Sequence, residues 1–168
     1  DEWPDLLKGG ADKDGLEDMI AIAKSCQDNG NENYLSMLLK EMCYTTGSAG
    51  IYQPIEMTTD PIQHIYDIPT LNETLSFFTD EKIGEEHLYL DSYIDGDRLF
   101  CVYPDYRPSS EFASVILGAS YYGENGEIVI EGCSYTYINT NTGKVANTTI
   151  KVHLIQDETG KYILDYIE

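Results

Sequence analysis

Hydrophobic and polar residues alternate along the second half of the chain, and the alternation is most regular near its end. Ile150, Val152 and Leu154 fall on one side of an extended segment, whereas Lys151 and His153 fall on the other. A period of two is typical of a β-strand in which one face is buried and the other is solvated. The pattern therefore predicts an antiparallel sheet with one apolar side.

Turns that contain glycine divide this half of the chain into six predicted strands. Asp95-Gly96 and Asn125-Gly126 have the strongest hairpin preference, because their residues accept positive φ angles. Thr142-Gly143 and Thr159-Gly160 mark two further turns. The predicted strands run from His87 to Ile94, Arg98 to Tyr103, Ala113 to Tyr122, Glu127 to Asn139, Lys144 to Gln156 and Lys161 to Ile167.

The first half of the chain has a different period, which predicts helices. One helix is expected from Asp14 to Gln27, a second from about Glu32 to Tyr44, and a third from a cap at Thr70 to about Phe78. The proline-rich stretch from Thr45 to Pro69 predicts an extended segment around Ile51 to Met57, which is a candidate first strand, and then an irregular connection. The apolar stripe of the first helix consists of Leu16, Met19, Ile20, Ala23 and Cys26.

Together these elements predict an α+β fold, with N-terminal helices packed on a curved antiparallel meander sheet of about six strands. Each helix has an apolar stripe to bury, and the apolar side of the sheet is the natural partner for it. Residues 1–11 are expected to form a leader or linker, because they contain Pro4 and the Gly9-Gly10 pair. Residues 12–168 are expected to form a single domain, since a chain of this size needs only one core.

Charge narrows the classes of partner. Thirty acidic residues against ten basic ones give a net charge of −20, which disfavours nucleic acid and anionic membrane surfaces as partners. A basic protein, a cation or solubility alone would suit this charge. No stretch approaches the roughly 20 apolar residues of a membrane-spanning helix, so no membrane insertion is expected. The chain is expected to be soluble as given, and a signal peptide or lipid anchor removed before Asp1 stays open.

The four cysteines do not have the spacing of a zinc site. Cys26 and Cys43 fall on the apolar faces of predicted helices, and Cys101 and Cys133 fall within predicted strands. In such positions a free thiol behaves as a small hydrophobic residue. Buried free thiols are the first prediction, and a disulfide between Cys101 and Cys133 is the alternative.

Tyrosine is the unusual component of the composition, with fourteen residues in the chain. Tyrosine suits both half-buried sheet faces and binding surfaces, because its ring is apolar and its tip is polar. One interpretation has these rings packing beneath the helices or lining a closed cone. The other has them forming an exposed or cleft-lining surface for a ligand. The candidate binding residues are Tyr89, Tyr93, Tyr135, Tyr137, Tyr162 and Tyr166, with Tyr135 and Tyr137 on one face of their strand and Tyr162 and Tyr166 on one face of the last strand.

The sequence contains few residues in a pattern that would indicate a catalytic or metal-binding site. His87 and Asp91 would share a strand face, but Tyr89 separates them, so an exposed or interfacial surface is expected there rather than an acid–base pair. No nucleophile elbow, phosphate loop or dinucleotide fingerprint occurs. Asp12-Lys13-Asp14-Gly15 lacks the register of an EF-hand and is explained by an acidic helix start. No cofactor, metal or catalytic residue is therefore predicted.

The order of elements resembles a known superfamily. Helices followed by a long antiparallel meander that ends in the strand from Gly160 to Ile167 resemble the nuclear transport factor 2-like, or cystatin-like, cone-shaped superfamily. The region from Thr70 onward is also similar to small envelope proteins with the order helix, Phe-Thr, strand, Asp-Gly, strand, which here are Phe78-Thr79 and Asp95-Gly96 with their neighbours. Secreted inhibitors of cell-wall DL-endopeptidases belong to that group. The hairpin from His87 to Tyr103 adds strands beyond the minimal cone.

The resemblance implies that the protein lies outside the cytoplasm, where it is either secreted or anchored by a lipid to a bacterial cell envelope. The expected function is that of a non-catalytic binding or inhibitory module. Its expected partner is a basic envelope protein such as a cell-wall hydrolase. The alternative is a small-molecule-binding or enzymatic cone-fold domain with a pocket lined by tyrosines.

Overall fold

The described part of the chain divides into two compact units. The first contains residues 1–30 and 110–168, and the second contains residues 31–109. The prediction of a single domain from residue 12 to residue 168 stays a prediction, and the expected leader at 1–11 lies outside the described residues. The computed structural model describes residues 13–28, 30, 34–36, 39, 54–60, 62–88, 91–102 and 111–168.

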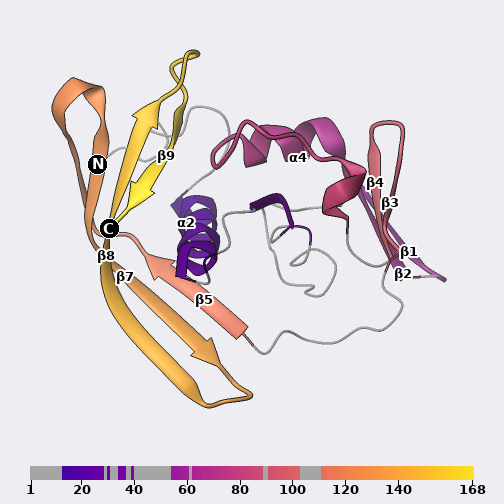
Figure 1. The fold of residues 1–168 in the computed structure, drawn as a ribbon, viewed down its shortest axis with the longest axis horizontal. Coiled ribbons are helices and arrows are strands. Elements are labelled where there is room, and N and C mark those ends of the chain that lie inside the picture. Colours follow the sequence, from indigo (N-terminus) through magenta and orange to yellow (C-terminus); the bar gives the residue numbers. More distant parts are fainter. Residues whose placement is uncertain are drawn as a thin grey trace. The chain divides into compact units, whose positions relative to one another are not determined.

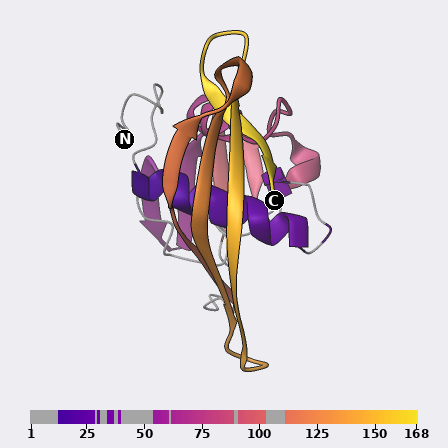
Figure 2. The same ribbon diagram turned by 90° about the vertical axis from the view of Figure 1, so that its left-hand side faces the viewer.

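The first unit is a helix packed on a curled antiparallel sheet, as the sequence predicts. Helix α2 (Lys13–Asp28) lies across the strands on one side of the sheet (Figures 1 and 2). The strand order is β5-β7-β8-β9, and β6 pairs with β7 beyond the end of β5. The strands are β5 (Glu111–Ile116), β6 (Ala119–Tyr122), β7 (Ile128–Asn139), β8 (Lys144–Gln156) and β9 (Tyr162–Ile167), with a short 3₁₀ helix, η2 (Glu124–Gly126), between β6 and β7.

The core of this unit lies between α2 and the side of the sheet that faces it, which we call the inner face. Two hydrogen bonds fix the helix there: Glu17 Oε2 accepts the Leu117 N–H at 2.8 Å, and Gln27 donates to the Ile167 carbonyl at 3.4 Å. The alternation of Ile150, Val152 and Leu154 is confirmed, because all three side chains are buried. Truncating such a residue to alanine typically costs about 2–5 kcal/mol. Other buried residues are Leu16, Met19, Ile20, Ala23, Cys26, Val115, Ile128, Ile130, Cys133 and Ile167.

A β-bulge and a glycine together produce the curl of this sheet. Glu131 and Gly132 of β7 stand opposite the single residue Lys151 of β8, and Gly132 has a φ of +67°. Gly118 separates β5 from β6 at the same level, where a Cβ atom would lie 1.8 Å from the Glu131 carbonyl oxygen. The predicted strand from Ala113 to Tyr122 is therefore broken, because only glycine allows this close approach of the backbones.

The second unit contains a four-stranded antiparallel sheet in the order β1-β2-β4-β3. The predicted Asp95-Gly96 hairpin is confirmed: Asp95 pairs with Arg98, and Gly96 has a φ of +60° at the first turn position. The elements are β1 (Glu56–Thr59), β2 (Ile62–Asp67), α4 (Ile68–Leu75), the 3₁₀ helix η1 (Glu85–His87), β3 (Tyr93–Asp95) and β4 (Arg98–Val102), as labelled in Figure 1.

The six predicted strands do not form one meander, because the β3–β4 hairpin pairs with β2 in the second unit. Strand β2 lies in the segment that the sequence assigned to an irregular connection. The two prolines that indicated a connection instead bound the strand: Pro61 precedes it, and Pro69 occupies the first turn of α4. Proline is tolerated in the first turn of a helix, because its missing N–H is not required there.

The helices of the second unit also differ from prediction. Helix α4 begins at Ile68 and its cap is Asp67, not Thr70, because the Asp67 carboxylate accepts the Thr70 N–H at 3.1 Å. The predicted helix from Glu32 to Tyr44 lies mostly outside the described residues, but residues 34–36 and 39 are helical. Leu35 and Leu39 are buried, in agreement with the predicted apolar stripe.

Candidate functional site

The side of the curled sheet that faces away from α2, here called the outer face, carries the most organised group of polar side chains among the described residues. Residues directly opposite each other in neighbouring strands lie on the same face. Tyr121 pairs with Val129, Val129 with His153, and His153 with Tyr166, so these four form one row across β6, β7, β8 and β9. The row lies on the outer face because its neighbours Ile130 and Val152 are buried on the inner face.

His153 lies at the centre of this row and is held from three sides. Its Nδ1 lies 3.1 Å from Glu127 Oε1, and its Nε2 lies 2.6 Å from Glu168 Oε2. Tyr166 stacks on the imidazole ring with centroids 4.0 Å apart and planes 10° apart. An ionised carboxylate only accepts hydrogen bonds, so two carboxylates at the two ring nitrogens are both satisfied when both nitrogens donate.

A second group of charges continues the row along the outer face. Lys151 Nζ lies 3.4 Å from Glu131 Oε1 and 3.9 Å from Glu168 Oε2, and the Tyr121 hydroxyl donates to Glu131 at 2.9 Å. The hydrogen bond from Tyr121 lowers the pKa of Glu131, and that bond also raises the pKa of Tyr121. Hydrogen bonding to Glu131 raises the pKa of Lys151. We call the set Tyr121, Glu127, Glu131, Lys151, His153, Tyr166 and Glu168 the outer network.

The carboxylates of the outer network limit what His153 can bind. Both nitrogens of His153 are occupied by carboxylates, so a substrate or a metal ion would have to displace one of them. Glu131 and Glu168 are about half exposed and present carboxylates to solvent. This arrangement can attract a cationic group on a partner.

A row of three exposed apolar side chains lies farther along the same face. Phe112 of β5 pairs with Ile138 of β7, which pairs with Val145 of β8. Their side chains are 54%, 36% and 60% exposed. We call these residues the outer row. Together the three side chains form a continuous apolar surface across β5, β7 and β8.

Four of the predicted binding tyrosines belong to the first unit and lie on both faces of its sheet. Tyr135 is buried beneath α2, where burial raises its pKa to about 12, and Tyr137 is half-buried on the same face, as predicted. Tyr162 and Tyr166 do not share a face, because a bulge at Asp165 shifts the register: Tyr162 faces inward and Tyr166 outward. Tyr93 stacks on Phe100 at 4.7 Å in the second unit, and Tyr89 lies outside the described residues.

His87 is not part of a strand, so the strand face that it was predicted to share with Asp91 does not form. It ends the short helix η1 and is buried rather than exposed. The Gly84 N–H donates to its Nδ1 at 3.0 Å, which closes a local turn in place of an extended strand.

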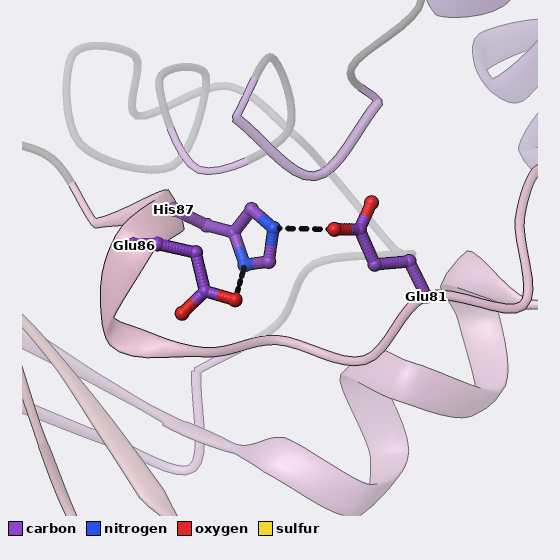
Figure 3. A group of neighbouring side chains, drawn as sticks. All are labelled: Glu81, Glu86 and His87. Atoms are coloured by element: carbon purple, nitrogen blue, oxygen red, sulfur yellow. Dashed lines mark hydrogen bonds and ion pairs between the residues drawn. The ribbon is translucent and has the colours of Figure 1, made fainter.

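The group Glu81, Glu86 and His87 has the composition of a metal site but not the free ligand atoms (Figure 3). Because Nδ1 accepts the Gly84 N–H, the proton of the neutral ring is on Nε2, which donates to Glu81 at 3.0 Å. Glu86 Oε1 is 3.8 Å from Nδ1, too far for a hydrogen bond. A metal ion at Nε2 would require that Nδ1 gain a proton and lose its bond from Gly84. The geometry therefore favours a structural role.

The cysteines among the described residues are buried, as predicted for hydrophobic thiols. Cys26 and Cys133 lie in the core of the first unit and Cys101 in the sheet of the second. Cys133 is a free thiol whose pKa is raised by burial, so the alternative of a Cys101–Cys133 disulfide is wrong for this structure. Cys43 lies outside the described residues.

Sequence reasoning missed the outer network and the outer row. The alternation placed Lys151 and His153 on the outer face, but the carboxylates come from a turn (Glu127), a bulge (Glu131) and the residue after β9 (Glu168). The outer row was detectable in principle, because Ile138 and Val145 occupy polar-side positions of strands whose other side is already apolar.

No helix among the described residues is long and apolar enough to cross a membrane. No protein-family model, no curated protein and no solved structure matches this chain. The resemblance to the nuclear transport factor 2-like superfamily therefore stays a prediction, and the chain is described by its own geometry: one helix on a curled antiparallel sheet, and a second unit built on four strands.

Proposed function

We propose that this protein is a non-catalytic binding or inhibitory module of a bacterial cell envelope, located outside the cytoplasm, and that it binds a basic protein such as a cell-wall hydrolase. The observation that carries the proposal is the outer row, Phe112, Ile138 and Val145. Apolar side chains left exposed on a rigid sheet face are costly in water and become favourable when a partner covers them.

Charge supports a basic partner. The chain has a net charge of −20, which attracts a positively charged protein over distances longer than any contact. The outer row itself has no acidic residue, but Glu131 and Glu168 of the outer network present carboxylates on the same face. An apolar contact flanked by exposed charges has the composition of a protein–protein interface, with an apolar centre and a polar rim.

The engagement of the histidines supports a non-catalytic role. His153 is bound by two carboxylates, and His87 by a backbone N–H and a carboxylate. Tyr135, a candidate for a pocket lining, instead packs beneath Lys24 of α2. The arrangement of α2 across a curled antiparallel sheet also supports a cone-like fold of the nuclear transport factor 2-like type for the first unit.

The experiment compares three immobilised proteins: the wild type, the double variant Phe112→Asp with Val145→Asp, and a control with Asn125→Asp and Gln156→Glu. The control adds the same two charges at exposed positions near the opposite end of β8 from Val145. Basic proteins from an envelope fraction should be retained by the wild type and the control but not by the outer-row variant. Equal retention by all three proteins, or none by the wild type at low salt, would refute the proposal.

A further inference from the structure

Among the described residues, strand β8 has no strand partner along one edge over about half its length. Strand β9 pairs with β8 only from Val152 to Gln156, and two backbone hydrogen bonds between Lys151 and Glu168 end the pairing. From Lys144 to Ile150, β8 pairs with β7 on one side and with no described strand on the other. Figure 1 shows β7 and β8 continuing together beyond the end of β9. Every second residue of this stretch therefore directs its N–H and C=O groups away from the sheet.

Within the described residues, this edge has one of the features that usually protect an exposed strand, the charge of Lys144 at its end. Lys144 is the only charged residue between Cys133 and Ile150, and the stretch contains no proline. Val145, Asn147, Thr148 and Thr149 are all exposed. Thr and Val favour extended backbone, so the edge is already in the conformation that a further strand would require.

We propose that the edge of β8 from Lys144 to Ile150 binds an extended segment of a positively charged protein, which adds to the sheet as a further strand. The inference rests on the proposed function and names the surface that serves it. Backbone hydrogen bonds would supply affinity, and side chains on alternate positions would supply specificity.

The outer row extends to this edge through Val145, and it determines which side chains of an added strand would fit there. An added strand places one residue directly beside Val145, on the same face as Ile138 and Phe112. An apolar residue there would continue the outer row. Two residues along, a polar residue would face Asn147, which already accepts a hydrogen bond from Thr136 at 2.7 Å. The bound segment thus alternates apolar and polar residues.

The net charge of the chain favours a strand from another protein over a second copy of this chain as the occupant of the edge. Two copies each carry a net charge of −20 and repel each other, whereas a positively charged segment is attracted. The two occupants respond to salt in opposite directions. Added salt screens the repulsion between copies and so favours a dimer, but it weakens the attraction of a basic segment.

The test measures amide hydrogen exchange residue by residue by NMR. The probe is the peptide Lys-Thr-Val-Thr-Val-Thr-Lys, supplied free and, in a second arm, attached through a short flexible linker after Glu168, whose backbone already bonds to Lys151. Attachment gives an effective concentration of about millimolar, so weak intrinsic affinity does not hide pairing. Alternate amides between Lys144 and Ile150 should exchange about tenfold more slowly with either probe. A probe of the same composition with N-methylated alternate residues should give no protection.

Two variants and one salt series complete the design. Val145→Lys should weaken binding of the free peptide about tenfold, whereas Asn141→Lys in the neighbouring hairpin loop should leave it unchanged. Absence of alternate protection even in the attached probe overturns strand addition. If envelope proteins still bind through Phe112 in that case, the proposed function survives alone. A dimer that strengthens with salt and protects the same amides overturns the foreign partner in favour of a second copy.

Discussion

Tyr166 stacks face to face on His153, with ring centroids 4.0 Å apart and planes 10° apart. The stack exists because the bulge at Asp165 turns Tyr166 to the outer face, where it lies directly opposite His153. The ring covers an imidazole whose two nitrogens are bound by Glu127 and Glu168. Because of this one-residue bulge, Tyr166, which was predicted to bind a ligand, instead packs against His153 of the outer network.

Removal of this ring should destabilise the first unit. Tyr166→Ala is expected to lower the melting temperature by about 2–4 °C, because the stacking contact is lost and His153 becomes exposed. Tyr166→Phe keeps the ring and should behave like the wild type. Thermal unfolding followed by circular dichroism checks both variants. An equal loss in the two variants would show that the hydroxyl, not the stack, matters.

Protonation of Glu131 at low pH should weaken the outer network and lower the stability of the protein. The pKa of this carboxyl is below its ordinary value of 4.5, mainly because Tyr121 donates to it. Its contribution to stability is therefore present above the unfolded pKa and is lost as pH falls through the lower folded pKa. The melting temperature of the wild type should fall between about pH 5 and about pH 3 more steeply than that of Glu131→Gln. Parallel curves for the two proteins would contradict the prediction.

Alkali should act on Tyr135. Burial beneath α2 raises its pKa from 10.0 to about 12. A raised pKa means that the stability it contributes is complete below the unfolded pKa and is lost as pH rises from about 10 to about 12. Tyr135→Phe cannot ionise and should lose less stability over this range, as measured by denaturant unfolding at each pH. Identical pH dependence of the two proteins would place Tyr135 in solvent.

Gly118 should tolerate no side chain. A Cβ atom there would lie 1.8 Å from the Glu131 carbonyl oxygen, which is backbone and cannot rotate away. Gly118→Ala should therefore destabilise the protein by about 1–3 kcal/mol or more. Gly84→Ala is the matched control, because its new Cβ meets only the mobile carboxylate of Glu86. Chemical denaturation should separate the two variants, and equal stabilities would mean that the bulge is not as close to Gly118 as described.

The neutral ring of His87 should have its proton on Nε2. Gly84 donates to Nδ1 and Glu81 accepts from Nε2, which fixes this tautomer. Nitrogen chemical shifts of the imidazole report the tautomer directly. Equimolar zinc should leave these shifts unchanged, because Nε2 offers no lone pair. A zinc-dependent shift at Nε2 would instead assign a metal site to Glu81, Glu86 and His87.

Local sequence patterns correctly predicted the helices, strands and hairpins that depend only on residues close together in the sequence. Helix α2 follows from its apolar stripe, and β8 spans Lys144–Gln156 as its alternation predicts. The hairpins at Asp95-Gly96 and Asn125-Gly126 follow from residues that accept positive φ. These elements need only the backbone preference of their own residues and one apolar face to bury.

The failures come from interactions that the local pattern does not contain. Two bulges, at Glu131-Gly132 and Asp165, reverse which side of the strand faces inward, so counting alternate residues past them gives the wrong face. The Gly84–His87 hydrogen bond replaces a predicted strand by a turn. Division of the strands between two sheets depends on pairing between β2 and β4, which are about thirty residues apart and leave no periodic signal.

The proposed function requires the outer row to contact a partner protein. Site-specific photo-cross-linking tests it most directly, with the photoreactive residue placed at Val145 and, as a control, at the exposed loop residue Asn125. The account predicts a discrete adduct with a basic protein from the Val145 position, lost when Phe112→Asp is added, and none from Asn125. Adducts from both positions, or from neither, would contradict it.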